Sequence, residues 1–175
     1  MSETMTQMVG VAVPTLRELR SAVLSASDSD AAVNALREAG YAGGDAVYEA
    51  FERWIAESSG ADHFDTGDLS LHAFGEKTTR FFRDAGWGEV TFTGDDAEGI
   101  ATIDIENCWE GPVAGDIGCQ ITTGMLAAFF GRVAGFAVAV LETECCSTGS
   151  SRCRFLLGNA DVMAAKWEEL AADAQ

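Results

Sequence analysis

Four residues in the second half of the sequence have the types and positions that could hold a metal ion: Cys119, Glu142, Cys145 and Cys153. Glu142 and Cys145 lie at the end of one predicted strand, and Cys153 lies at the start of the next, across a short turn. A hairpin brings such positions together at little cost, because loop-closure entropy grows slowly with length. Three thiolates and one carboxylate form a tetrahedral ligand set that suits Zn²⁺ and leaves no position open for a catalytic water.

The spacing of these residues differs from the paired CxxC motifs of common zinc sites. The alternative is that the cysteines simply pack in the core, as small buried thiols often do. Two further cysteines remain. Cys146 adjoins Cys145 and could replace it as a ligand, whereas Cys108 either packs in the core or lies free near a strand end.

The composition limits the classes of protein to which the chain can belong. It has 175 residues, of which 47% are hydrophobic, enough for one domain with its own core and too many for a disordered chain. Asp and Glu number 28 against 11 Lys and Arg, which gives a formal net charge of −17. Such a charge repels phosphate backbones and anionic lipids, so we expect no binding to nucleic acid or to a membrane surface.

No stretch reaches the roughly 18–20 uncharged apolar residues that span a bilayer. The N-terminal residues also lack the basic start and the long apolar run of a signal peptide. We therefore expect a cytoplasmic protein, whose five cysteines are free thiols or metal ligands rather than disulfides.

Helical spacing of apolar residues predominates in the first half of the chain. We expect a flexible leader over residues 1–14 and a single domain over residues 15–175. The first expected helix starts at Thr15 and the second at Asp28 or Ser29. A third carries Val47, Phe51, Trp54 and Ile55 on one face, and a fourth starts at Asp68. Gly40 is expected to end the second helix, because glycine is common just after helix C-termini, and Gly43-Gly44 to break the chain again.

A period of two residues follows and predicts strands. The expected order is a hairpin of strands 89–93 and 100–105, a helix over 117–133, strands over 137–141 and 152–157, and a last helix from Asp161 to about Ala172. The fold class is therefore α/β of the α+β type, with N-terminal helices packed on a mainly antiparallel sheet.

Residues from about 29 to 158 resemble the 4-vinyl reductase domain, a small-molecule-binding module related to the vesicle-tethering TRAPP subunits. The resemblance is carried by Gly124 with Gly135, Glu142-Thr-Glu-Cys145, Gly149 and Cys153-Arg-Phe155. The same stretch of sequence is similar to the sensor domain of phenol- and toluene-responsive transcription activators. Their zinc is held by a Cys, a Glu 23 positions later, a Cys three later and a Cys eight beyond that. The four residues named above reproduce every interval, so the resemblance implies a structural zinc.

The resemblance also implies a ligand pocket. Leu71-His72 looks like the Leu-His pair of those sensors, whose imidazole hydrogen-bonds the phenol hydroxyl; the alternative is an exposed histidine at a helix start. Ile105 occupies the position of a ligand-binding Trp, which favours a less polar or differently shaped ligand. The candidate ligand-binding residues are His72, Phe74, Ile105, Trp109, Ile121, Met125 and Phe129. The apolar members of this set are equally consistent with an ordinary core.

Two classes of function follow, with a third alternative. The favoured one is a sensor domain for a hydrophobic, aromatic small molecule, which would signal through a downstream protein partner or through its oligomeric state. The second is an enzyme or accessory factor in tetrapyrrole or aromatic metabolism, although the sequence has no GxSxG, P-loop or dinucleotide motif and only His63 and His72 as imidazole bases. The third is an assembly protein that binds no ligand.

A homodimer is implied by the related domains, which pair through their N-terminal helices. The stripe of Leu16, Leu19 and Val23 would then contact a second copy. The alternative is that this stripe packs on its own domain.

Overall fold

The computed structural model describes residues 9–59, 70–95, 99–111 and 118–173, except for the side chains of Ser59, Leu71, Asp95 and Asp173. The helices are α1 (Val13–Ala26), α2 (Ser29–Ser59), α3 (Leu71–Asp84), α4 (Gln120–Ala134) and α5 (Ala160–Asp173), and the strands are β1 (Glu89–Asp95), β2 (Ile100–Glu106), β3 (Val138–Glu144) and β4 (Cys153–Asn159). Among these helices, none is both long enough and apolar enough to cross a bilayer.

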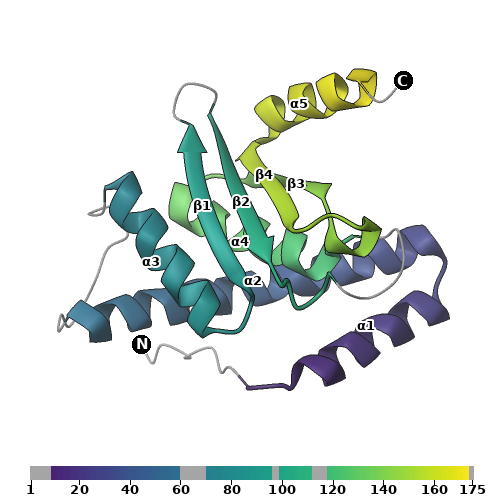
Figure 1. Ribbon diagram of the computed structural model, residues 1–175, viewed down its shortest axis with the longest axis horizontal. Helices are drawn as coiled ribbons and strands as arrows, with labels where there is room; N and C mark the ends of the chain where they lie inside the picture. The colour runs from purple at the N-terminus through teal and green to yellow at the C-terminus, as the bar shows by residue number, and fades with distance from the viewer. Residues whose placement is uncertain (1–8, 60–69, 96–98, 112–117, 174–175) are drawn as a thin grey trace, which may run out of the picture.

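The four strands form one antiparallel sheet in the order β1-β2-β4-β3. Ile103 of β2 lies opposite Phe92 of β1 and Phe155 of β4, so one face of the sheet is apolar. Helix α4 lies behind the sheet, with α2 behind α4 (Figure 1). The expected α+β class with a mainly antiparallel sheet is confirmed.

Helix α2 corrects the expectation that Gly40 ends one helix and Gly43-Gly44 breaks the chain. The helix runs unbroken from Ser29 to Ser59, and the Asp28 side chain caps it by accepting from Ala31 N–H. Gly40 and Gly44 allow close packing on α4. A Cβ on Gly40 would lie 2.0 Å from the Ile121 carbonyl oxygen, and one on Gly44 would lie 2.4 Å from the Ala128 Cβ.

Gly124 of α4 allows the same close approach to α2, because a Cβ at this position would lie 2.0 Å from the Arg37 carbonyl oxygen. Small residues therefore bring the two backbones together, and the resulting packing compensates for the low helix propensity of glycine. A pattern that suggested helix ends instead marks a helix–helix contact.

Aromatic rings fill the space between the helices and the sheet. Phe51 of α2 is fully buried and meets Phe81 edge to face at 5.2 Å and Phe129 at 5.4 Å between ring centroids. Rings from α3 and β1, among them Phe74 and Phe92, continue the cluster. This core fixes α4 and the sheet relative to each other, and the candidate site lies where they meet.

The remaining boundaries differ from the expectations by a few residues. Pro14 lies inside the first turn of α1 rather than ending a leader, in keeping with its fit to the start of a helix. Ser70 caps α3 by accepting from Ala73 N–H, and Asn159 rather than Asp161 caps α5 by accepting from Val162 N–H. His63, Asp68 and residues 1–8 of the expected leader lie outside the described residues.

Candidate metal centre

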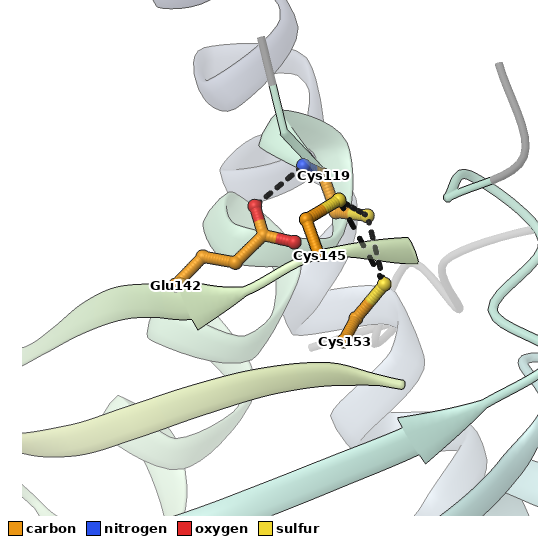
Figure 2. A group of neighbouring side chains, drawn as sticks. All are labelled: Cys119, Glu142, Cys145 and Cys153. Carbon is orange, nitrogen blue, oxygen red and sulfur yellow. Dashed lines mark hydrogen bonds between the residues drawn. The ribbon is translucent and has the colours of Figure 1, made fainter. Parts of the chain in front are cut away.

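The structure brings Cys119, Glu142, Cys145 and Cys153 together at one end of the sheet. Cys119 is the residue just before α4, Glu142 lies on β3, Cys145 follows β3, and Cys153 begins β4. Figure 2 shows the four side chains converging from these elements. One possible ligand atom from each lies within 4.8 Å of the other three.

The sulfur atoms are spaced as tetrahedral ligands of one ion would be. Cys119 Sγ lies 3.8 Å from Cys145 Sγ and 3.6 Å from Cys153 Sγ, and these last two lie 3.9 Å apart. Zinc–sulfur bonds of about 2.3 Å in a tetrahedron place the sulfurs ~3.8 Å apart. The three thiols therefore match the geometry of a thiolate site.

Glu142 completes the set of candidate ligands, because one of its two carboxylate oxygens is available to a metal ion. Its Oε2 accepts from the Cys119 backbone N–H at 2.7 Å, whereas its Oε1 is buried without a hydrogen-bond partner among the described residues. A buried carboxylate oxygen without a partner is costly, and a cation at the centre of the cluster would supply one. This atom distinguishes the cluster from cysteines that merely pack in a core.

Gly118 makes room for this carboxylate. It has a positive φ of 71°, and a Cβ there would clash with Glu142 Oε2. Any other residue would be strained and would displace the Glu142 side chain. Sequence reasoning missed Gly118, although a glycine directly before a candidate ligand was a visible signal.

The cluster holds more acidic groups than can ionise side by side. Burial raises the pKa of Glu142 to about 8. The pKa of the Cys119 thiol is raised, chiefly by its contact with Cys108, and the pKa of Cys145 is lowered, chiefly by its contact with Cys119. The groups thus share protons in the absence of a cation, and a divalent ion between them would favour the charged form of each.

Two neighbouring polar groups contact the sulfurs. The Cys146 backbone N–H donates to Cys153 Sγ at 3.4 Å, and the Ser147 hydroxyl lies 3.0 Å from Cys145 Sγ. Such contacts stabilise thiolates and orient metal ligands. The Cys146 thiol is not part of the group of four, and neither is Cys108, although its Sγ lies 3.9 Å from Cys119 Sγ.

A buried ion pair that the sequence did not reveal supports the start of α4. Glu110 accepts from Arg20 Nε of α1 at 3.2 Å and from the backbone N–H groups of Ile121 and Thr122. Arg20 also donates to the Gly118 carbonyl at 2.8 Å. The pair therefore joins α1 to the peptide segment that carries Cys119, and it satisfies N–H groups that a helix start leaves open.

The structure does not gather the seven predicted ligand-binding residues around one cavity. Phe74, Ile105 and Phe129 are buried in the aromatic core. Trp109, Ile121 and Met125 line a groove beside α1 and α2.

His72 lies apart from both groups, with its side chain 86% exposed and its Nε2 3.6 Å from Glu76. Two residues correspond to about 200° around a helix, so the Phe74 position that faces the core turns His72 toward solvent. It borders a separate surface pocket between α3 and β1, with Thr91 and Thr93. The structure therefore gives no contact between His72 and the other six residues.

Comparison with known proteins agrees with the resemblance stated from the sequence. Residues 102–159 match the family model of the 4-vinyl reductase domain, and this range contains all four residues of the cluster. No curated protein sequence matches the chain.

Two solved structures share the fold. The phenol-responsive sensory domain of the transcription activator PoxR, solved with phenol, has a TM-score of 0.67 at 19% identity, over 95% of this chain and 83% of that one. A trafficking protein particle complex subunit 3 from Naegleria fowleri, covalently bound to palmitic acid, has a TM-score of 0.64 at 13% identity, over 83% of this chain and 91% of that one. At these identities the likeness concerns the fold.

Proposed function

We propose that this protein is a small-molecule sensor domain for a hydrophobic, aromatic ligand, built around a structural zinc ion held by Cys119, Glu142, Cys145 and Cys153. The observation that carries the proposal is the buried group of three thiols and one carboxylate, whose ligand atoms all lie within 4.8 Å of one another. Bound zinc would supply a cross-link between the start of α4 and the β3–β4 hairpin.

The composition of the donor set favours zinc in a structural role. Thiolate-rich tetrahedral sites select zinc over harder cations such as magnesium and calcium, which prefer oxygen ligands. Four protein ligands also leave no position for a reactive water. The donor set therefore supports a site that stabilises the fold and not one that carries out a reaction.

The metal is tested by elemental analysis and native mass spectrometry of protein prepared without chelator. We expect one zinc per chain in the wild type. Cys153→Ser should lose the metal and lower Tm by about 10 °C or more, because metal-binding free energy contributes directly to folding. Cys108→Ser, which changes a buried thiol outside the group of four, is the matched control and should keep the zinc. Metal-free wild-type protein, or equal zinc in both variants, would refute the assignment.

The sensor role is supported by the fold, which this chain shares with a phenol-sensing domain over most of its length. We propose that the chain acts as a cytoplasmic homodimer that signals through a partner protein. Leu19 of α1 is among the exposed large hydrophobic residues, as a dimer contact there requires. The same native mass spectra report the oligomeric state and any retained ligand.

Ligand binding is tested by equilibrium dialysis against simple aromatic hydrocarbons. Binding without chemical change supports the sensor role. Formation of a product when a reductant is added would support instead an enzyme or accessory factor of tetrapyrrole or aromatic metabolism. A chain that binds no aromatic molecule would contradict the sensor role and favour an assembly protein, since the fold is also that of a trafficking complex subunit.

A further inference from the structure

A groove of about 510 Å³ runs between the N-terminal segment, α2, the end of α3 and the start of α4, and we call it the N-terminal groove. Every described residue that lines it is glycine, alanine, an aliphatic residue, methionine or tryptophan. None of these lining residues has a charged, hydroxyl or amide side chain, which is unusual for a surface of a protein with a net charge of −17. The side chains of the groove therefore offer burial of apolar area and almost no hydrogen bonds.

The walls of the groove differ from a flat hydrophobic patch. Its floor includes Trp109 and Met125, which are only 6% and 2% exposed, so the hollow reaches into the packed interior. At its rim Val9 and Val11 are 81% and 46% exposed. Apolar side chains on both sides of a hollow of this volume are typical of a small-molecule site, for which about 300–1,000 Å³ is usual.

We propose that the N-terminal groove is the ligand site of this protein and that it takes an uncharged hydrocarbon, with the indole rings of Trp87 and Trp109 against the ligand. This inference rests on the proposed sensor function and gives that function a place and a ligand class. The indole N–H groups are the only side-chain donors among the described lining residues, so a ligand carboxylate would lose its hydration without gaining a cation.

The size of the groove narrows the ligand further. A dry cavity of about 150 Å³ is enough to hold benzene, so a hollow of about 510 Å³ accommodates two or three fused rings or an alkyl-substituted ring. His72 takes no part, because it borders a different pocket.

Gly43 provides a variant that fills the groove without disturbing the fold. It lines the groove in the middle of α2, and a Cβ there would meet no atom within 4 Å. Gly43→Leu therefore occupies ligand space while it also improves the helix propensity of α2. Ala42→Leu, at the preceding position of the same helix, adds a similar side chain at an exposed residue that does not line the groove.

The experiment is equilibrium dialysis of the zinc-loaded full chain against naphthalene and against 2-naphthoate, with Tm and sedimentation recorded for each protein. We expect the wild type to bind naphthalene at least tenfold more tightly than 2-naphthoate. Gly43→Leu should weaken naphthalene binding at least tenfold with an equal or higher Tm, whereas Ala42→Leu should leave it unchanged.

The outcomes that overturn the inference are separable from those that overturn the sensor function. Equal naphthalene binding by the wild type and Gly43→Leu would place the ligand elsewhere and leave the sensor function standing. Preference for 2-naphthoate would refute the ligand class. Absence of binding to the wild type would refute both. If Gly43→Leu then also turned a dimer into a monomer, the groove would be a contact between subunits.

Discussion

The ion pair between Arg20 and Glu110 should be essential for stability, and its removal gives a prediction with a magnitude. Both residues are buried, with 2% and 1% of their surface exposed. The Glu110 carboxylate accepts from Arg20, from two backbone N–H groups and from the Thr122 hydroxyl at 2.9 Å. All these partners lie at the start of α4 or on α1.

Arg20→Met removes the cation and keeps much of the side-chain volume. Glu110 is then left buried without its counter-charge, and breaking a buried pair in this way costs about 3–5 kcal/mol. For a chain of this length, a loss of that size lowers Tm by about 6–20 °C. The double variant Arg20→Met/Glu110→Gln leaves no unpaired charge and should recover part of the loss.

The assay is urea unfolding of the zinc-loaded proteins, followed by circular dichroism. The control is Arg17→Met, the same change one turn earlier on α1, where the guanidinium donates to the Trp109 carbonyl at 2.7 Å. That variant should lower the free energy of unfolding by about 1 kcal/mol. Equal losses in the two variants, or a loss below about 1 kcal/mol for Arg20→Met, would refute the reasoning.

The pH dependence of Arg20→Met follows from Glu110, whose pKa burial already raises above its ordinary value. A carboxyl with a folded-state pKa above its unfolded value favours folding in its protonated form. The defect of Arg20→Met should therefore be smaller at pH 5 than at pH 8. Metal affinity should fall as well, by about 10–100-fold, since Arg20 holds the Gly118 carbonyl next to a ligand.

Two further predictions concern the helix pair and the sheet. Gly124→Ala should lower the free energy of unfolding by about 1–3 kcal/mol or more, since its Cβ would lie 2.0 Å from the Arg37 carbonyl oxygen. Gly131→Ala on the same helix meets nothing closer than 3.5 Å and should be neutral or stabilising. Thermal unfolding compares the two variants. The hydrogen bond from Arg154 lowers the pKa of Asp104 below its ordinary 3.8, so the stabilisation is present above about pH 4 and lost as pH falls. Asp104→Asn should therefore destabilise the protein at pH 7 but not at pH 2 to 3 in urea titrations, and an equal loss at both values would contradict this.

The sequence predicts best what depends on residues near one another in the chain. The β3–β4 hairpin and the approach of Glu142, Cys145 and Cys153 follow from strand periodicity and one short turn. Three of the four candidate ligands could be grouped for this reason, and only Cys119 required contact over a longer distance.

What the sequence could not predict depends on contacts between distant segments. Gly40 has the same local signal whether it ends a helix or packs on another backbone, and only the position of α4 decides between them. Arg20 and Glu110 are 90 residues apart, and nothing local distinguishes a buried pair from two surface charges. His72 is a different case, because a Leu-His motif does not fix the rotation of α3 about its axis, which turns this side chain toward solvent.

The candidate metal centre and the N-terminal groove share one structural element. Cys119 occupies the N-cap position of α4, and Ile121 and Met125, in the next two turns, line the groove. Trp109 lines the groove as well, and the next residue, Glu110, holds the start of α4. A metal bound to Cys119 would therefore fix the helix that forms one groove wall without touching the ligand. If the groove holds the ligand as proposed, the thiol cluster would support recognition by position alone, because the indole N–H groups are the only side-chain donors among the described lining residues and the shape of the groove must do most of the selection.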